Sequence, residues 1–216
     1  MEALILYFVL FFPGVYTSSF PAHGIEMDLI HFSALQELGR TLTYTLPSLA
    51  LLWYIMSDKK GLSALKSEKT RIKDLIPFAA GLSSLVIIGI AVSFLVSRFS
   101  GLPGLAPPLK VEAPGSIPGW TVMVISCLST GYLEESYFRY YLLTRLENAI
   151  PMEALRILFS TVLFSLCHFY EGPWGILNAA LAGILLSVLF VRFRSLHGIA
   201  WAHGVYNIFV YVMGGV

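Results

Sequence analysis

Glu134-Glu135-Ser136-Tyr137-Phe138-Arg139 interrupts a part of the chain that is otherwise hydrophobic enough for a membrane. Two further polar pairs follow in apolar sequence, Phe164-x-x-x-His168 and His203-x-x-x-Asn207. An ionisable side chain within a bilayer span costs about 3 kcal/mol on insertion scales. Because such groups persist mainly where a function or a partner holds them, the three stretches mark the candidate functional part of the chain.

The composition predicts a membrane protein. Of 216 residues, 56% are hydrophobic and 12% are charged, and the mean hydropathy is +0.75. Soluble helices need a polar face, so the long charge-free runs argue against a soluble domain. The net charge is +1 and the sequence has no basic stripe, which gives no indication of nucleic-acid binding. Cys127 and Cys167 lie in apolar runs, and we expect two buried free thiols.

Runs without Asp, Glu, Lys or Arg predict about seven transmembrane helices, packed as an all-α bundle around an intramembrane polar cavity. About 20 residues cross a hydrocarbon core of about 30 Å. The fifth run is short, but a helix that starts after Pro151 would lengthen it. Pro13 and Pro47 are expected to kink the first two helices. The runs are 3–25, 41–57, 75–97, 113–133, 157–170, 172–191 and 195–216.

The distribution of basic residues predicts the orientation. The segment 57–74 holds six of the 14 Lys and Arg residues, which places it and the N-terminus in the cytoplasm. The outer segment 98–119 then contains only Arg98 and Lys110 as basic residues. Together with the small size, this predicts an integral protein of a prokaryotic inner (plasma) membrane with a cytoplasmic N-terminus.

Glu135 and Arg139 are four residues apart, so on a helix they share a face and are placed to form an ion pair. Glu134 points about 100° away from Glu135 and has no partner close to it in the sequence. A lone carboxylate in a membrane is kept protonated by desolvation or is held by a second group, and either state suits it to accept a proton. The alternative interpretation is a buried polar network that only holds helices together.

His203 and Asn207 also lie four residues apart, on one face of the last predicted helix. Two neutral donors side by side suit an oxyanion where the backbone N–H groups are locked in a helix; an interhelical hydrogen bond is the alternative. Counted at about 1.5 Å per residue, these two residues, Glu134 and His168 lie roughly 10 to 18 Å from the cytoplasmic ends of their spans. They are therefore able to meet in one water-filled cavity, and they predict an intramembrane hydrolase.

Other protease chemistries fit the sequence less well. It contains no H-E-x-x-H motif. Its three Asp residues lie outside the expected membrane core, which argues against an aspartyl dyad. A zinc site built from Glu134, His168 and His203 is the alternative mechanism, but it leaves Asn207 without a role.

In these three motifs the chain resembles the CPBP family: type II CAAX prenyl proteases and bacteriocin-processing or immunity proteins, also called Abi proteins. The family signature is E-E-x-x-x-R, then F-x-x-x-H, then H-x-x-x-N, and all three are complete and in order here. The resemblance covers about Trp120 to Tyr211. It implies an intramembrane glutamate-type endopeptidase that needs no metal and no other cofactor.

The resemblance also implies a role for each motif residue. Glu134 and His168 would activate the hydrolytic water, and His203 and Asn207 would stabilise the oxyanion. The supporting residues Glu135 and Arg139 would brace the first motif helix and position the catalytic carboxylate.

We therefore expect one membrane domain over 1–216, with N-terminal helices and loops at 1–112 and catalytic helices at 113–216. The expected reaction is hydrolysis of a peptide bond near the C-terminus or membrane segment of a protein or peptide. The expected partners are the lipid bilayer and a membrane-associated substrate, lipidated or carrying a C-terminal sorting signal. A non-catalytic immunity or scaffold protein and a proton-linked transporter are the alternatives from other functional classes.

Overall fold

The computed structural model describes residues 1–11, 29–30, 32–57, 70–99 and 110–213. In these ranges the regular structure is helical, apart from a two-residue parallel pairing of β1 with β2. The elements are α1 (Glu2–Leu10), β1 (Leu29–Ile30), α3 (Ala34–Arg40), η1 (Thr41–Thr45), α4 (Leu46–Met56), η3 (Ile72–Asp74), α6 (Leu75–Phe99), β2 (Lys110–Val111), α7 (Ile117–Glu135), η4 (Ser136–Tyr141), α8 (Leu142–Arg145), α9 (Glu153–Cys167), η5 (Phe169–Glu171), α10 (Gly172–Phe193) and α11 (Leu196–Met213).

The described helices fall into seven segments that overlap the seven predicted runs. α3, η1 and α4 follow one another without a break, as do α7, η4 and α8, and η1 and η4 are π-helical. α9 begins at Glu153, in agreement with the start expected after Pro151. Pro47 lies in the first turn of α4, directly after η1, whereas Pro13 lies outside the described residues. Cys127 is buried, Cys167 is half-buried, and both are free thiols.

Two of the described helical stretches are long and apolar enough to cross a membrane, Ile72–Phe99 and Phe169–Phe193. Only 22% of the most apolar part of the first stretch is buried, and Ile87, Ile90 and Phe94 on it are exposed. An apolar helix that is mostly exposed suits a lipid environment better than the core of a soluble protein. The all-helical fold is thus confirmed, while the seven spans and the polar cavity stay predictions.

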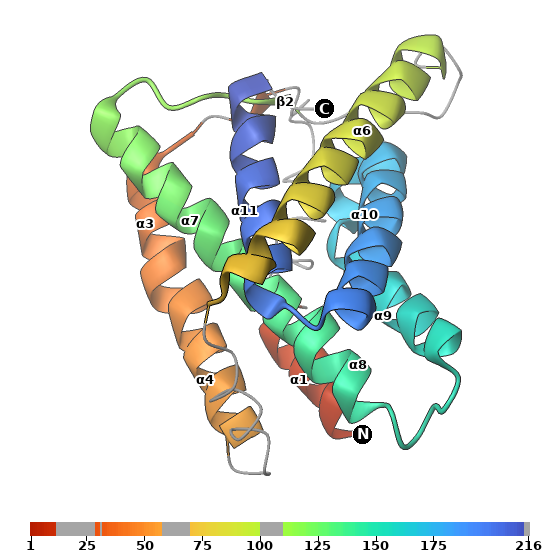
Figure 1. The fold of residues 1–216 in the computed structure, drawn as a ribbon. Helices are drawn as coiled ribbons and strands as arrows, with labels where there is room; N and C mark the ends of the chain where they lie inside the picture. Colours follow the sequence, from red (N-terminus) through yellow and green to blue (C-terminus); the bar gives the residue numbers. More distant parts are fainter. Residues whose placement is uncertain (12–28, 31, 58–69, 100–109, 214–216) are drawn as a thin grey trace.

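The helix α7 runs through the middle of the molecule (Figure 1) and organises the packing around it. α11 crosses α7 and also packs against α6, while α3 and α4 lie along the other side of α7. α10 packs against both α6 and α9. The three elements that carry the polar motifs therefore belong to one packed unit.

Two glycines bring the backbones of α7 and α11 into direct contact. A Cβ atom on Gly131 would lie 2.9 Å from the backbone oxygen of Ala200. One on Gly204 would lie 2.9 Å from the Cα atom of Leu128. Small residues at helix crossings permit this close approach in membrane proteins. The crossing places the start of the first motif on α7 against the last motif on α11.

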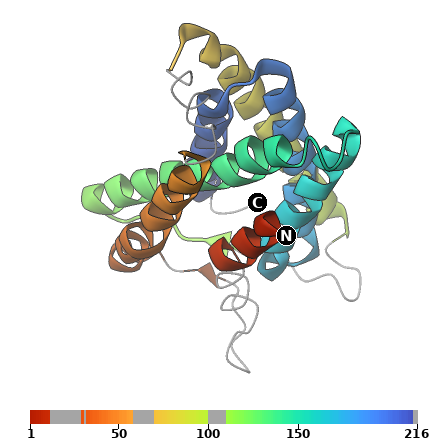
Figure 2. The same cartoon turned by 90° about the horizontal axis from the view of Figure 1, so that it is seen from below.

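The short helix α1 packs against the elements that carry the motifs, on the face of the molecule that Figure 2 shows. The Tyr7 hydroxyl donates to the backbone oxygen of Leu163 on α9 over 3.1 Å. The Tyr137 hydroxyl of η4 donates to the backbone oxygen of Ala3 over 2.6 Å. Phe11 packs against the rings of Tyr137 and Phe138. These contacts join the aromatic residues of η4 to the N-terminal segment.

Candidate active site

An arginine, two glutamates and a histidine contact one another in a row where α7 packs against α11. Arg139 Nη1 donates to Glu135 Oε1 over 2.9 Å, and both side chains are completely buried. The same carboxylate oxygen lies 2.8 Å from His203 Nδ1. The other ring nitrogen of His203, Nε2, lies 3.6 Å from Glu134 Oε2. The ion pair expected from the four-residue spacing is therefore present, and it continues through the imidazole to the second carboxylate.

The accessibility of the two carboxylates separates their roles. The Glu135 side chain is fully buried, whereas 16% of the Glu134 side chain is exposed. Glu135 Oε1 receives both the guanidinium of Arg139 and the imidazole of His203, and such a doubly held carboxylate suits a positioning role. Among the described residues, the one side-chain contact of Glu134 is the longer one to the imidazole, so it is the carboxylate with capacity left for a water or a substrate.

The guanidinium of Arg139 is fixed on three sides. Besides its bond to Glu135, its Nη2 lies 3.4 Å from the backbone oxygen of Gly183 on α10. Its central carbon lies 4.3 Å from the centre of the Phe164 ring on α9, a cation–π distance. A buried charge of this kind needs such partners, because removing one leaves an uncompensated ion. Arg139 thereby connects α7, α9 and α10 at the site.

Phe164 lies between the two histidines of the motifs. Its ring centre is 4.7 Å from that of His168 and 5.9 Å from that of His203. The first residue of the F-x-x-x-H motif is therefore an organising element that contacts the arginine and both imidazoles. Phe164 is part of the motif, but the sequence alone does not indicate that its ring contacts these three side chains.

The hydrogen bond of His168 defines its tautomer. Its Nδ1 lies 2.9 Å from the backbone oxygen of Phe164. A carbonyl only accepts hydrogen bonds, so Nδ1 carries a proton, and in the neutral ring Nε2 is an acceptor. His168 follows the last residue of α9 and is half-buried. The residue therefore offers one basic nitrogen on the same side of α9 as Phe164.

Not all predicted site residues meet. Glu134 and His203 approach each other, and Phe164 connects His203 with His168. No hydrogen bond joins Asn207 to any other predicted site residue; it lies four residues beyond His203 on α11 and is half-buried. Within the described residues, no group of three or more His, Cys, Asp or Glu side chains is arranged to hold a metal ion.

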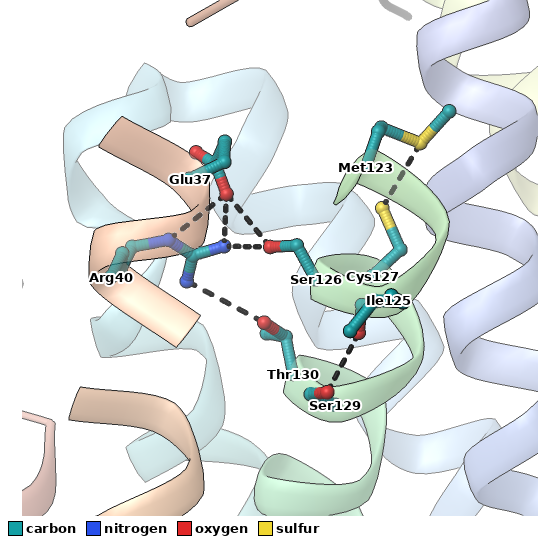
Figure 3. Close-up of polar contacts among 8 residues, drawn as sticks. All are labelled: Glu37, Arg40, Met123, Ile125, Ser126, Cys127, Ser129 and Thr130. Atoms are coloured by element: carbon teal, nitrogen blue, oxygen red, sulfur yellow. Dashed lines mark hydrogen bonds and ion pairs between the residues drawn. The ribbon is translucent and has the colours of Figure 1, made fainter. Parts of the chain in front are cut away.

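A second polar cluster, which the sequence gave no reason to expect, lies further along α7 (Figure 3). Arg40 on α3 donates through Nε and Nη2 to Glu37 Oε2, over 3.2 and 2.8 Å. Nη2 also donates to Ser126 Oγ on α7 over 2.8 Å, and Nη1 lies 3.5 Å from Thr130 Oγ1. Arg40 and Glu37 precede the apolar run that starts at residue 41, so a count of uncharged residues leaves them outside the span.

Comparison with known proteins gives a match over the part of the chain that carries the three polar motifs. Residues 116–209 match the family model described as "Type II CAAX prenyl endopeptidase Rce1-like". This match confirms the resemblance inferred from the three motifs and includes every predicted site residue. No curated protein and no solved structure gives a significant match to the chain.

Proposed function

We propose that this chain, whose residues 116–209 belong to the type II CAAX prenyl endopeptidase Rce1-like family, is an intramembrane endopeptidase of the glutamate type. The family supports a peptide hydrolase embedded in a membrane. The observation that carries the mechanism is the 3.6 Å approach of His203 Nε2 to Glu134 Oε2, with Nδ1 of the same ring held by Glu135. One imidazole thus faces the reactive carboxylate while a buried ion pair fixes its orientation.

In the first step Glu134 would act as the general base. Its carboxylate takes a proton from a water molecule, and the hydroxide adds to the carbon of the scissile carbonyl. His168 would orient that water through Nε2, the acceptor left when Nδ1 donates to the backbone oxygen of Phe164. This division of roles leaves the proton on Glu134 and the negative charge on the former carbonyl oxygen.

In the second step His203 and Asn207 would stabilise the oxyanion. A doubly protonated His203 donates through Nδ1 to Glu135 and through Nε2 to the oxyanion, and the amide of Asn207 supplies the second donor. The carbonyl then re-forms, the C–N bond breaks, and Glu134 delivers its proton to the leaving amine. The products are a carboxylic acid and an amine, which exchange a proton to become a carboxylate and an ammonium group, and the carboxylate of Glu134 is regenerated.

The substrate we propose is a membrane-associated protein or peptide that is cut near its C-terminus or membrane segment. A lipidated C-terminus is one candidate and a C-terminal sorting signal is another. We place the protein in a prokaryotic inner membrane with its N-terminus in the cytoplasm. The support is the basic segment 57–74 together with the two apolar helical stretches.

The test compares cells that produce wild type, Glu134→Gln and Glu153→Gln at matched levels. Glu153 is exposed at the start of α9 and provides a matched control for the loss of one carboxylate. Newly formed protein termini are measured by mass spectrometry, with and without a chelator. Termini made by wild type and Glu153→Gln but absent with Glu134→Gln support the proposal.

Two results would replace the proposal. Loss of the termini with the chelator would favour the zinc-dependent alternative. Identical termini in all strains, with all three proteins folded in the membrane, would favour a non-catalytic immunity or scaffold protein.

A further inference from the structure

The guanidinium of Arg40 has hydrogen-bonding capacity that its described partners do not use. Arginine has five N–H donors. Nε and Nη2 are occupied by Glu37 and Ser126. Within the described part of the chain, Nη1 has only the contact with Thr130, and at 3.5 Å this is long for a hydrogen bond. The Nη1 edge is therefore available to an acceptor, and 42% of the Arg40 side chain is exposed.

The partners of Arg40 fix its orientation. Ser126 Oγ accepts from Arg40 and donates to Glu37 Oε2 over 2.7 Å, which closes a small ring of hydrogen bonds. Figure 3 shows that Nη1 points away from this ring toward Thr130. Because Nε and Nη2 are held, the planar guanidinium fixes the position of its remaining donor nitrogen, Nη1, which can bind one oxygen of a carboxylate.

The free edge points along α7 toward the candidate catalytic carboxylate. Ser126, Thr130 and Glu134 follow one another at four-residue intervals and so share one face of the helix. Arg40 contacts two residues of this face, Ser126 and Thr130. Arg40 and Glu134 therefore face one common region next to α7.

We propose that Arg40 binds the free C-terminal carboxylate of the peptide substrate while Glu134 acts on a peptide bond a few residues upstream. This inference rests on the endopeptidase function proposed above and adds a recognition site to it. The carboxylate would bind the Nη1 edge, and the Thr130 hydroxyl would be a second donor. Glu37 would hold the guanidinium in place without occupying that edge.

The spacing along α7 predicts where the substrate is cut. At 1.5 Å per residue, Thr130 lies about 6 Å and Ser126 about 12 Å along the axis from Glu134. A carboxylate on Arg40 is thus roughly 6 to 12 Å from the reacting carbonyl. An extended peptide advances about 3.3 Å per residue, so this distance corresponds to about two to four residues. The released fragment should therefore be about two to four residues long.

The experiment uses the purified full chain in lipid vesicles and two pools of N-terminally labelled, lipid-anchored peptides. The pools share the same randomised C-terminal residues, but one ends in a free carboxylate and the other in an amide. Cleavage rates and fragment lengths are measured by mass spectrometry. Wild type should cleave the acid pool with a kcat/KM about 10 to 100 times that of the amide pool, the range expected for a hydrogen-bonded charged contact.

Variants at Arg40 then test its part in this preference. Arg40→Gln should lower the acid-to-amide ratio to about one by slowing the acid pool alone. Arg40→Lys should restore part of the ratio, because lysine keeps the positive charge but not the fixed planar arrangement of N–H donors. Arg145→Gln is the matched control: Arg145 is exposed, pairs with Glu2 at the start of α1, and should keep the full ratio.

A second variant separates recognition from a purely structural role. Glu37→Gln removes the competing carboxylate, so binding of the acid pool to a Glu134→Gln background should become tighter while binding of the amide pool stays the same. If the cluster only joins α3 to α7, Arg40→Gln and Glu37→Gln should weaken both pools equally and lower the unfolding temperature.

The outcomes distinguish the two proposals. An acid-to-amide ratio near one for wild type, or a ratio unchanged by Arg40→Gln, overturns the carboxylate site and leaves the endopeptidase function intact. Absence of cleavage of either pool, with no difference between wild type and Glu134→Gln, overturns the endopeptidase function and the carboxylate site with it.

Discussion

The carboxylate of Glu135 on α7 holds the imidazole of His203 on α11, with 2.8 Å between Oε1 and Nδ1. The sequence suggested that Glu135 braces its own helix through Arg139. In the structure the same oxygen also orients a side chain of another helix. Glu135 therefore connects the fully buried guanidinium of Arg139 with the imidazole of His203, which faces Glu134.

Substitution of the two adjacent glutamates should give opposite results. Glu134→Gln should leave the protein folded and abolish cleavage, because it removes the base while the buried His203 keeps its shorter contact with Glu135. Glu135→Gln should leave the buried Arg139 uncompensated and lower the free energy of unfolding by about 3–5 kcal/mol. Thermal unfolding and cleavage by each purified variant provide the measurement. Equal destabilisation by both substitutions would contradict the assigned roles.

Two substitutions of His168 should distinguish the roles of its two ring nitrogens. Asn at this position retains a donor near the place of Nδ1 but has no group at the place of Nε2. Since Nε2 is the proposed contact with water, His168→Asn should lower kcat by about 10²–10⁴-fold with little change in stability. His168→Gln reaches further and should retain more activity. Activity in His168→Asn close to that of wild type would remove His168 from the mechanism.

Removal of the Phe164 ring should disturb the site without removing any polar group. Phe164→Leu loses the cation–π contact with Arg139 and the packing against both imidazoles, at a cost of about 0.5–2 kcal/mol. We expect cleavage to fall about tenfold in kcat. Phe159→Leu on the same helix is the control, because Phe159 is only partly buried at the edge of the core. Equal effects of both changes would indicate general packing.

A methyl group at the helix crossing should separate α7 from α11. The Cβ atom of Gly204→Ala would lie 2.9 Å from the Leu128 Cα atom, so a backbone must move. We expect lower stability and loss of cleavage, because the crossing brings His203 to Glu134. Gly39→Ala is the control: no atom lies within 4 Å of its added Cβ, and alanine favours a helix by about 1 kcal/mol over glycine. A fully active Gly204→Ala protein would disprove this dependence.

The orientation in the membrane is testable by chemical labelling. In a background carrying Cys127→Ala and Cys167→Ala, a single cysteine replaces Lys73 or Glu112, both of which are exposed. A membrane-impermeant thiol reagent added to intact cells should label the cysteine at 112 and spare the one at 73. The reverse pattern would place the N-terminus outside.

Local patterns were sufficient for part of this architecture. The four-residue spacing of Glu135 and Arg139 predicts their ion pair because both lie on one helix face. The charge-free runs likewise predict the positions of the helical segments. These features depend only on neighbours in the sequence, and therefore a single sequence contains them.

Contacts between residues far apart in the chain could not be predicted from the sequence. The contact of His203 with both glutamates depends on the close approach at Gly131 and Gly204, and nothing in a single chain identifies which glycines meet. The Arg40–Glu37 pair was missed because the span was taken to begin at the first uncharged residue. The helix instead starts at Ala34, so both charges lie beside the middle of α7.

The π-helical turn η4 contains Arg139 and joins α7 to α8. Its backbone bonds from i to i+5, so this stretch accommodates one residue more than an α-helical turn would. The wider turn takes up this extra residue, so the stretches before and after it keep nearly the phase of a regular helix that is one residue shorter. Across diverging sequences, the loss of one residue in this turn would therefore leave the side chains on either side of it facing the same neighbours, because a regular helix would replace the π-helical turn.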